Sequence, residues 1–353
     1  VEDKDSRTAA AALAVGVGAA SDPADIPGLA HFTEHMSMQG SDRYPEDNAY
    51  KKYLNTFGGS SNASTSMEHT VYKFGLAEPE QQDLSLSVKV EEGVGAPSSG
   101  VKSDSGEAKN DAIAGDHDHA AFRGALDIFS RFFISPLFNP KFIAREVKAI
   151  DAEDSKNRTS DDRRLLQVLK AVTDPRCSYS KYSTGNMMTL KEGDTIVHAA
   201  MVAFHAQHYK PDNMALAVVA NASLDLQESW VTERFSLIPS QCSPEGAEGT
   251  GNKSTATYSF DGIADSPPLE GSKAVVFPEC SSRWLTQDAL PRLVKFAPLR
   301  ELRRLTLLWE IPPTRRHWRQ SPTRLASHLL GHEAPGSAFA LMQDKGWVTG
   351  LSA

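Results

Sequence analysis

Two stretches without a regular apolar pattern limit how this chain can be divided into folded parts. From about 79 to 118 the composition shifts to Gly, Ser, Asp, Glu and Ala, which offers too little apolar surface to offset the entropy lost when a chain becomes ordered. A second stretch, over 241–268, is rich in Gly, Ser and Pro and is typical of a linker. We therefore expect a first domain over 1–240 with a surface insertion at about 79–118, a linker over 241–268, and an incomplete second domain over 269–353.

Four parts of the sequence have the pattern of strands. Small apolar residues fill Thr8 to Gly18, as in a buried strand. Residues 60–76 alternate between polar and apolar positions, which predicts two paired strands with a turn at MEHT. Residues 204–220 predict a helix end, a turn and a strand, and 303–312 (RRLTLLWEIP) predict a strand in the second domain.

Helical spacing of apolar residues recurs in the remaining ordered segments. Helices are expected to begin near Leu29 and to cover 46–57, 121–135, 141–172 and 223–238. In the second domain, residues 321–347 predict two helical segments that are broken at Ala334-Pro335-Gly336.

Charge and composition exclude some classes of partner. The net charge of −8 argues against a nucleic-acid binder, whose surface must be positive. No apolar run reaches the roughly 18 residues of a membrane span, so we expect no membrane partner. The basic stretch over 283–324 is interpreted as a solvated face, with a site for an acidic partner as the alternative.

The expected compartment follows from the amino terminus and from the cysteines. The first residues, VEDKDSR, are acidic on balance, whereas a secretory signal begins with basic residues. Cys177, Cys242 and Cys280 are widely spaced, and we expect them to form no disulfide framework, as in a reducing compartment. These features predict a cytoplasmic location.

The segment LAHFTEHMSMQG (29–40) places two histidines and a glutamate within five positions. Residues four apart lie on one face of a helix, so His31 and His35 can direct imidazole nitrogens at one ion. Glu34 would lie close to that ion without ligating it, which suits a general base that takes a proton from metal-bound water. The alternative is the polar face of an ordinary helix, although the apolar neighbours of His31 favour an inward orientation.

A third ligand is available in the segment REVKAIDAEDSKN (145–157). Glu146 and Glu153 are seven apart, two helical turns along, and project from the same face. One could ligate the metal while the other accepts a hydrogen bond from a ligating histidine. Both could instead be solvated, as most helix acids are.

The whole series of segments resembles one peptidase family. The order HxxEH is that of the inverzincins, and its surroundings are similar to those in the insulin-degrading enzyme, nardilysin and pitrilysin family. The likeness continues in FFISPLFNPKFIAREVKAIDAEDSKN, YSKYSTGN, FHAQHYKPDNMALAVV and LLGHEAPGSAFALMQDKGW. It implies an α+β fold, in which a mostly antiparallel sheet packs against helices to form sandwich domains. Two such domains of homologous type are implied, the second incomplete.

The resemblance also implies a function and the residues that perform it. It implies a zinc-dependent endopeptidase that hydrolyses peptides and small unfolded proteins, with one Zn²⁺ per chain held by His31, His35 and Glu153. Glu34 would be the catalytic base for zinc-bound water, and Glu146 would support the site without ligating the metal.

Further residues are implied in substrate binding. Asn62 and Ala63 match an edge strand that pairs with the peptide backbone, and Gly331 and Glu333 match an anchor for the substrate's amino terminus. The family often has aromatic residues beside the scissile bond. The corresponding positions here are Ser64, Arg163 and Leu166.

Length is the largest departure from the family pattern. Family enzymes are much longer, and their C-terminal half supplies an Arg and a Tyr that act on the reacting peptide. The alternative to a peptidase is therefore a non-catalytic peptide- or zinc-binding half, or a fragment that needs a C-terminal partner half for activity.

Overall fold

The computed structural model of the chain describes residues 1–77, 119–240 and 292–353, except 313, 315, 316 and 318, and the backbone of two short strands, Ala256–Tyr258 and Val275–Phe277. The predicted insertion and most of the predicted linker lie outside the described residues. The domain boundaries stay a prediction.

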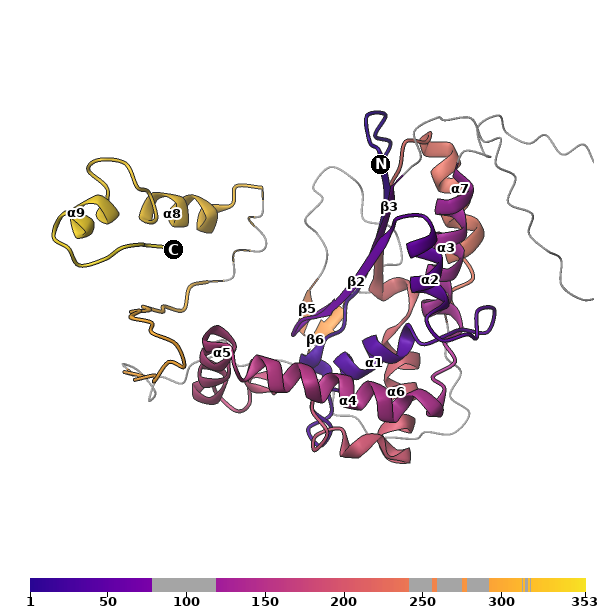
Figure 1. The fold of residues 1–353 in the computed structure, drawn as a ribbon, viewed down its shortest axis with the longest axis horizontal. Coiled ribbons are helices and arrows are strands. Elements are labelled where there is room, and N and C mark those ends of the chain that lie inside the picture. Colours follow the sequence, from indigo (N-terminus) through magenta and orange to yellow (C-terminus); the bar gives the residue numbers. More distant parts are fainter. Residues whose placement is uncertain are drawn as a thin grey trace, which may run out of the picture.

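An antiparallel sheet of four strands, in the order β2-β3-β1-β4, forms the centre of the described structure (Figure 1). Its strands are β1 (Thr8–Val15), β2 (Ser60–Thr65), β3 (Thr70–Ala77) and β4 (Met214–Val219). Alternate residues of β1 and β3 are buried, so one face of the sheet faces the core. The predicted strands at 8–18, in 60–76 and in 204–220 are confirmed.

Helices cover the buried face of this sheet. They are α1 (Leu29–Ser37), α2 (Ala49–Thr56), α3 (Ala120–Ile134), α4 (Pro140–Asn157), α6 (Thr195–His208) and α7 (Leu224–Phe235). Figure 1 shows α2, α3 and α7 beside the sheet, whereas α1, α4 and α6 gather near its lower end. The rings of Tyr72 and Phe74 on β3 pack against Phe133 and Phe129 on α3, which joins the two layers. The predicted α+β fold is confirmed.

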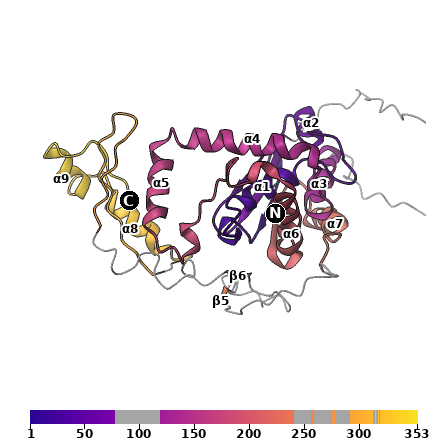
Figure 2. The same ribbon diagram turned by 90° about the horizontal axis from the view of Figure 1, so that it is seen from below.

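One predicted helix is wrong in its extent. Residues 141–172 form two helices, α4 and α5 (Asp161–Val172), rather than one. The chain leaves the helical conformation at Ser160, which has an extended backbone. Two acids, Asp161 and Asp162, then occupy the first turn of α5, where the helix dipole favours negative charge. As a result α5 turns sharply away from α4 (Figure 2).

A second prediction, a strand over 303–312, is also wrong. The described residues of 292–312 form neither helix nor strand, and Leu305, Trp309 and Ile311 are exposed. A strand needs a partner to satisfy its backbone, and no described strand lies beside this segment. The two predicted helical segments beyond it are confirmed as α8 (Pro322–Leu330) and α9 (Ala338–Asp344).

Cys177 is the only cysteine among the described residues, and it is disulfide-bonded. This disulfide contradicts the expectation that the three cysteines form no disulfide framework, as in a reducing compartment. None of the helices in the described part of the chain is long and apolar enough to cross a membrane.

Candidate metal centre

Helix α1 carries the HxxEH segment, and its first turn is held by polar contacts. The Asp22 carboxylate accepts hydrogen bonds from the backbone amides of Gly28 (2.7 Å) and Ala30 (2.8 Å), which satisfies amides that have no partner within the helix. Gly28 has a φ of 96°, and a side chain there would collide with the backbone of Gly185. The start of α1 is thereby held directly against the segment around Gly185.

His31, His35 and Glu153 come together between α1 and α4. Nε2 of His31 lies 3.4 Å from one Glu153 carboxylate oxygen, and Nε2 of His35 lies 3.7 Å from the other. Among the described residues this is the only group of three His, Cys, Asp or Glu whose ligand atoms lie within 4.8 Å of one another. Zinc bonds of about 2.0–2.1 Å in a tetrahedron separate ligand atoms by about 3.3–3.4 Å. The spacing and the chemistry of this donor set therefore fit zinc.

The second nitrogen of each histidine has its own partner. Nδ1 of His31 lies 2.7 Å from the backbone oxygen of Thr184, and Nδ1 of His35 lies 3.2 Å from Glu146. A carbonyl oxygen and a carboxylate both accept hydrogen bonds, so each Nδ1 carries the proton and each Nε2 presents its lone pair. Metal-ligating histidines have this arrangement.

Glu146 is thus placed behind His35, whereas Glu153 faces both Nε2 atoms. Glu146 is only 7% exposed. Its burial opposes ionisation, but the hydrogen bonds from His35 and from Nε of Arg145 (3.0 Å) outweigh burial and lower its pKa. For His35, burial opposes the charged form, and the hydrogen bond to Glu146 together with the nearby carboxylates raises its pKa.

Glu34 occupies a different side of α1 from the two histidines. Its side chain is buried and its Oε2 accepts a hydrogen bond of 2.5 Å from the hydroxyl of Thr65, the last residue of β2. Burial raises the pKa of Glu34, while Thr65 and the histidines oppose the increase. A carboxylate with a raised pKa is a more effective proton acceptor near neutral pH.

Two lysines that the sequence did not single out anchor the Thr184 segment. Nζ of Lys181 donates to the backbone oxygens of Ala20 and Asp22, both at 2.7 Å. Nζ of Lys170 donates to the backbone oxygen of Lys181 and to the hydroxyl of Ser183, both at 2.8 Å. Burial lowers the pKa of Lys170 to about 8 and raises the pKa of Asp22 to about 7. The motif YSKYSTGN was noted in the sequence, but it carries no signal that a backbone oxygen orients a histidine.

A groove of about 890 Å³ opens beside the metal cluster. Its lining includes His31 and Glu153, the β2 residues Ala63 to Thr65, and residues at the start of α5. Strand β2 is at the edge of the sheet, with Asn62 exposed on it. The structure therefore brings the predicted metal ligands and the predicted peptide-binding strand to one groove.

The predicted anchor for the substrate's amino terminus lies elsewhere. Gly331 follows the last residue of α8, and Glu333 is exposed in the turn before α9. In both Figure 1 and Figure 2, α8 and α9 lie on the far side of α5 from α1. The structure does not bring these two residues to the metal cluster.

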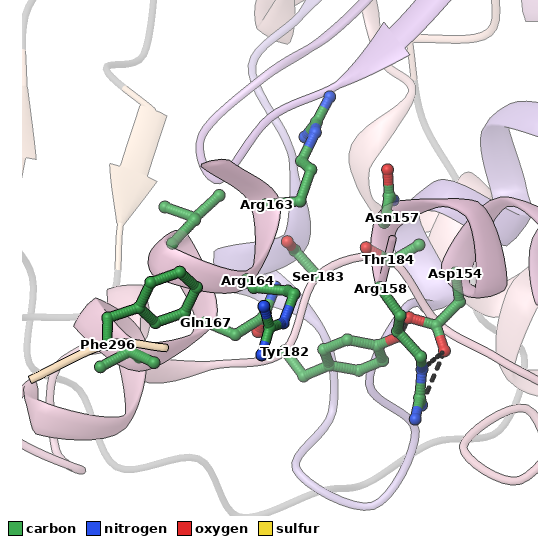
Figure 3. Close-up of a pocket in the computed structure, with 12 residues that line it drawn as sticks. Asp154, Asn157, Arg158, Arg163, Arg164, Gln167, Tyr182, Ser183, Thr184 and Phe296 are labelled. Carbon is green, nitrogen blue, oxygen red and sulfur yellow. Dashed lines mark hydrogen bonds and ion pairs between the residues drawn. The ribbon is translucent and has the colours of Figure 1, made fainter. Parts of the chain in front are cut away.

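The positions expected beside the scissile bond are found at the groove. Ser64 and Arg163 line it, and Arg163 and Leu166 also line an adjoining cavity of about 350 Å³ (Figure 3). Gly331 and Glu333, the predicted anchor for the substrate's amino terminus, line neither the groove nor this cavity.

Two protein-family models match the chain. The model described as Insulinase (Peptidase family M16) matches residues 1–89, which include the HxxEH segment. The model described as Peptidase M16 inactive domain matches residues 195–353.

Curated relatives match over nearly the whole chain. The A-factor-processing enzyme of Saccharomyces cerevisiae is 30% identical over 100% of this chain, and the insulin-degrading enzyme of Bos taurus is 31% identical over 99%. Nardilysin of Rattus norvegicus is 32% identical over 98%. The chain spans only 28%, 28% and 24% of the lengths of these proteins, respectively.

A solved structure has the same fold. The crystal structure of pitrilysin superposes with a TM-score of 0.66 at 24% sequence identity, covering 100% of this chain and 30% of that chain.

Proposed function

The chain belongs to the insulinase family of metallopeptidases (peptidase family M16), and from this premise we propose that it hydrolyses peptide bonds with a zinc ion held by His31, His35 and Glu153. The observation that supports the proposal is the convergence of these three side chains in a groove bordered by an edge strand.

The residues around the cluster have separate tasks in the proposed reaction. Zinc, when bound, supplies Lewis acidity, which lowers the pKa of water to about 7 and polarises a carbonyl group. The Thr65 hydroxyl occupies Oε2 of Glu34, which leaves Oε1 to take a proton from the attacking water. Glu34 then returns this proton to the amine that leaves.

The proposed substrate is an extended segment of a peptide. In the described sheet β2 is an edge strand, and with Asn62 and Ala63 it offers backbone groups to which such a segment can add as a further strand. Backbone pairing recognises the extended conformation and leaves the choice of side chains to the groove.

We also propose that full activity requires polypeptide that this chain does not contain. The relatives are more than three times longer than the matched region. Donors that stabilise the tetrahedral intermediate are each typically worth about 10²- to 10³-fold in rate. Addition of a C-terminal partner half is therefore expected to increase turnover without changing the zinc content.

The zinc content of matched variants tests the proposal. After dialysis, elemental analysis is expected to find about one zinc per chain in the wild type and in Glu34→Gln, and almost none in Glu153→Gln. With a quenched fluorescent peptide and the partner half added, only the wild type is expected to show turnover. Zinc retention by Glu153→Gln would contradict the ligand assignment, and turnover by Glu34→Gln would contradict the assignment of the base.

A further inference from the structure

We propose that the groove beside the metal cluster selects peptides with an acidic side chain, and that Arg163 recognises the carboxylate. This inference rests on the proposed function, because it names the substrate class for the same groove. It is carried by the position of Arg163 and by the pairing of the charges around it.

Arg163 lies where the groove and the adjoining cavity meet. It is in the first turn of α5 and lines both spaces. In Figure 3 its guanidinium points away from the cluster formed by Arg164, Tyr182 and Phe296. Ser64 is one of three β2 residues that line the groove, and its short side chain leaves space for a substrate side chain.

The acids at the start of α5 are already paired. Asp161 accepts a hydrogen bond from Arg164 at 2.8 Å, and Asp162 accepts one from Arg304 at 2.8 Å. Arg164 also stacks over the ring of Phe296, and it lines the adjoining cavity rather than the groove. The negative charges nearest to Arg163 in the sequence are therefore neutralised by other arginines.

An acid that lines the adjoining cavity, Asp154, is paired as well. Asp154 is buried and accepts hydrogen bonds from Nε of Arg158 (2.8 Å) and from the hydroxyl of Tyr182 (2.5 Å). Both of its carboxylate oxygens accept hydrogen bonds from residues other than Arg163.

Three cations of the groove have no such partner. In the part of the chain that the structure describes, none of Lys156, Arg163 and Arg300 forms an ion pair with a carboxylate, and all three are exposed. Lys156 lies one helical turn beyond Glu153 on α4. Glu301, an exposed acid of the same lining, lies 3.9 Å from Arg303. The unpaired charge that this groove offers to a ligand is therefore positive, although the whole chain carries −8.

A carboxylate complements this arrangement, and an ammonium group does not. The planar guanidinium of Arg163 can donate two parallel hydrogen bonds to a carboxylate. The same positive charge repels a lysine or arginine side chain of the peptide, so the groove favours one class and disfavours the other. The carboxylate could belong to an Asp or Glu side chain or to the C-terminus of the peptide, and the experiment separates these sources.

Peptide binding tests the inference without requiring hydrolysis. Glu34→Gln serves as the background, and fluorescence anisotropy measures the Kd of dye-labelled decapeptides that differ only at one central residue: Asp, Glu, Asn, Gln or Lys. All peptides are amidated at the C-terminus, and one Asn peptide is also made with a free carboxylate. We expect the acidic peptides to bind about three- to tenfold more tightly than their amide counterparts, and less so at high salt.

Three further variants in this background identify the residue. Arg163→Gln is expected to abolish the preference, and Arg163→Glu is expected to make the Lys peptide the tightest ligand. Lys148→Gln is the matched control, because it removes an exposed positive charge from α4 outside the groove. It is expected to leave the preference unchanged.

Several results would overturn the inference. Equal binding of acidic and amide peptides would do so, as would equal losses in Arg163→Gln and Lys148→Gln, or a preference for the free C-terminus alone. Absence of binding by every peptide would overturn it too. Zinc content and hydrolysis by the wild type report on the proposed function separately.

Discussion

Replacing Glu146 with glutamine is expected to weaken zinc binding although Glu146 does not face the metal. Glu146 is 7% exposed and lies 3.2 Å from Nδ1 of His35. Glutamine keeps an oxygen that can accept this hydrogen bond but removes the negative charge that raises the basicity of the imidazole. Loss of such a partner typically reduces metal affinity 10- to 100-fold. Because Glu146→Gln is a conservative substitution, we expect an affinity loss near tenfold, which corresponds to about 1.4 kcal/mol of binding free energy.

The pH dependence of the effect distinguishes it from a general structural defect. Zinc requires neutral His35. Burial lowers the pKa of His35, and Glu146 with the other carboxylates more than offsets this and raises it. Without the charge of Glu146 the pKa falls, so protonation competes with zinc only at lower pH. The ratio of the two dissociation constants is therefore expected to be largest above the pKa of His35 in the wild type and to shrink as the pH falls.

The assay is competition for zinc with a chromophoric chelator at several pH values. Asp151→Asn is the control, because it removes the same charge from α4 at a residue that contacts neither histidine and accepts a hydrogen bond from the amide of Met187. It is expected to change affinity less than threefold. An unchanged affinity in Glu146→Gln, or a loss that is equal in the control and independent of pH, would refute the reasoning.

Three further results are expected. Thr65→Val removes the hydroxyl that holds down the pKa of Glu34, so the acid limb of kcat/KM should move to higher pH while Thr65→Ser keeps the wild-type profile; an unmoved limb would contradict this. Burial raises the pKa of Asp22 to about 7, above the value of about 3.9 expected when unfolded, so the folded chain holds this proton more tightly. Relative to Asp22→Asn, the wild type should therefore lose up to about 4 kcal/mol of stability between pH 4 and 8 in urea unfolding, whereas a pH-independent difference would disprove the shift. Leu305 and Trp309 are 81% and 75% exposed, so changing both to serine should reduce the fluorescence of bound anilinonaphthalene sulfonate, and an equal signal would show that they are covered in solution.

The parts of the fold that the sequence predicted correctly depend on local periodicity. The alternation in 60–76 and the helical spacing after Leu29 each involve neighbours within a few positions, and both elements formed as expected. The break at Ser160 was missed because residues 151–164 contain Ala152 as their only apolar residue, so no apolar spacing marks where one helix ends and the next begins. The strand expected at 303–312 failed for a different reason, since a strand pattern predicts the conformation but supplies no partner.

In the candidate site, too, the sequence predicted what depends on local spacing and not what depends on distant contacts. Helical spacing could place His31 with His35 on one face, and Glu146 with Glu153 on another. It could not decide which acid faces the metal, and only the family resemblance pointed to Glu153. The backbone oxygen of Thr184 had no sequence signal at all, because any residue at that position supplies the same atom.

Helix geometry explains how adjacent residues of α1 can have different tasks. His31 and His35 are one turn apart and face α4, whereas Glu34 is rotated by about 100° from its neighbour and faces the end of β2. A glutamate on the α4 side would have competed with Glu153 as a ligand. On the β2 side it is buried, its pKa rises, and only one of its oxygens is occupied by Thr65. The Thr65 hydroxyl that contacts Glu34 therefore belongs to the sheet. The groups that orient the two histidines belong instead to α4 and the Thr184 segment. Substitutions in β2 should accordingly change proton transfer at constant zinc affinity, and substitutions behind the histidines should change zinc affinity first.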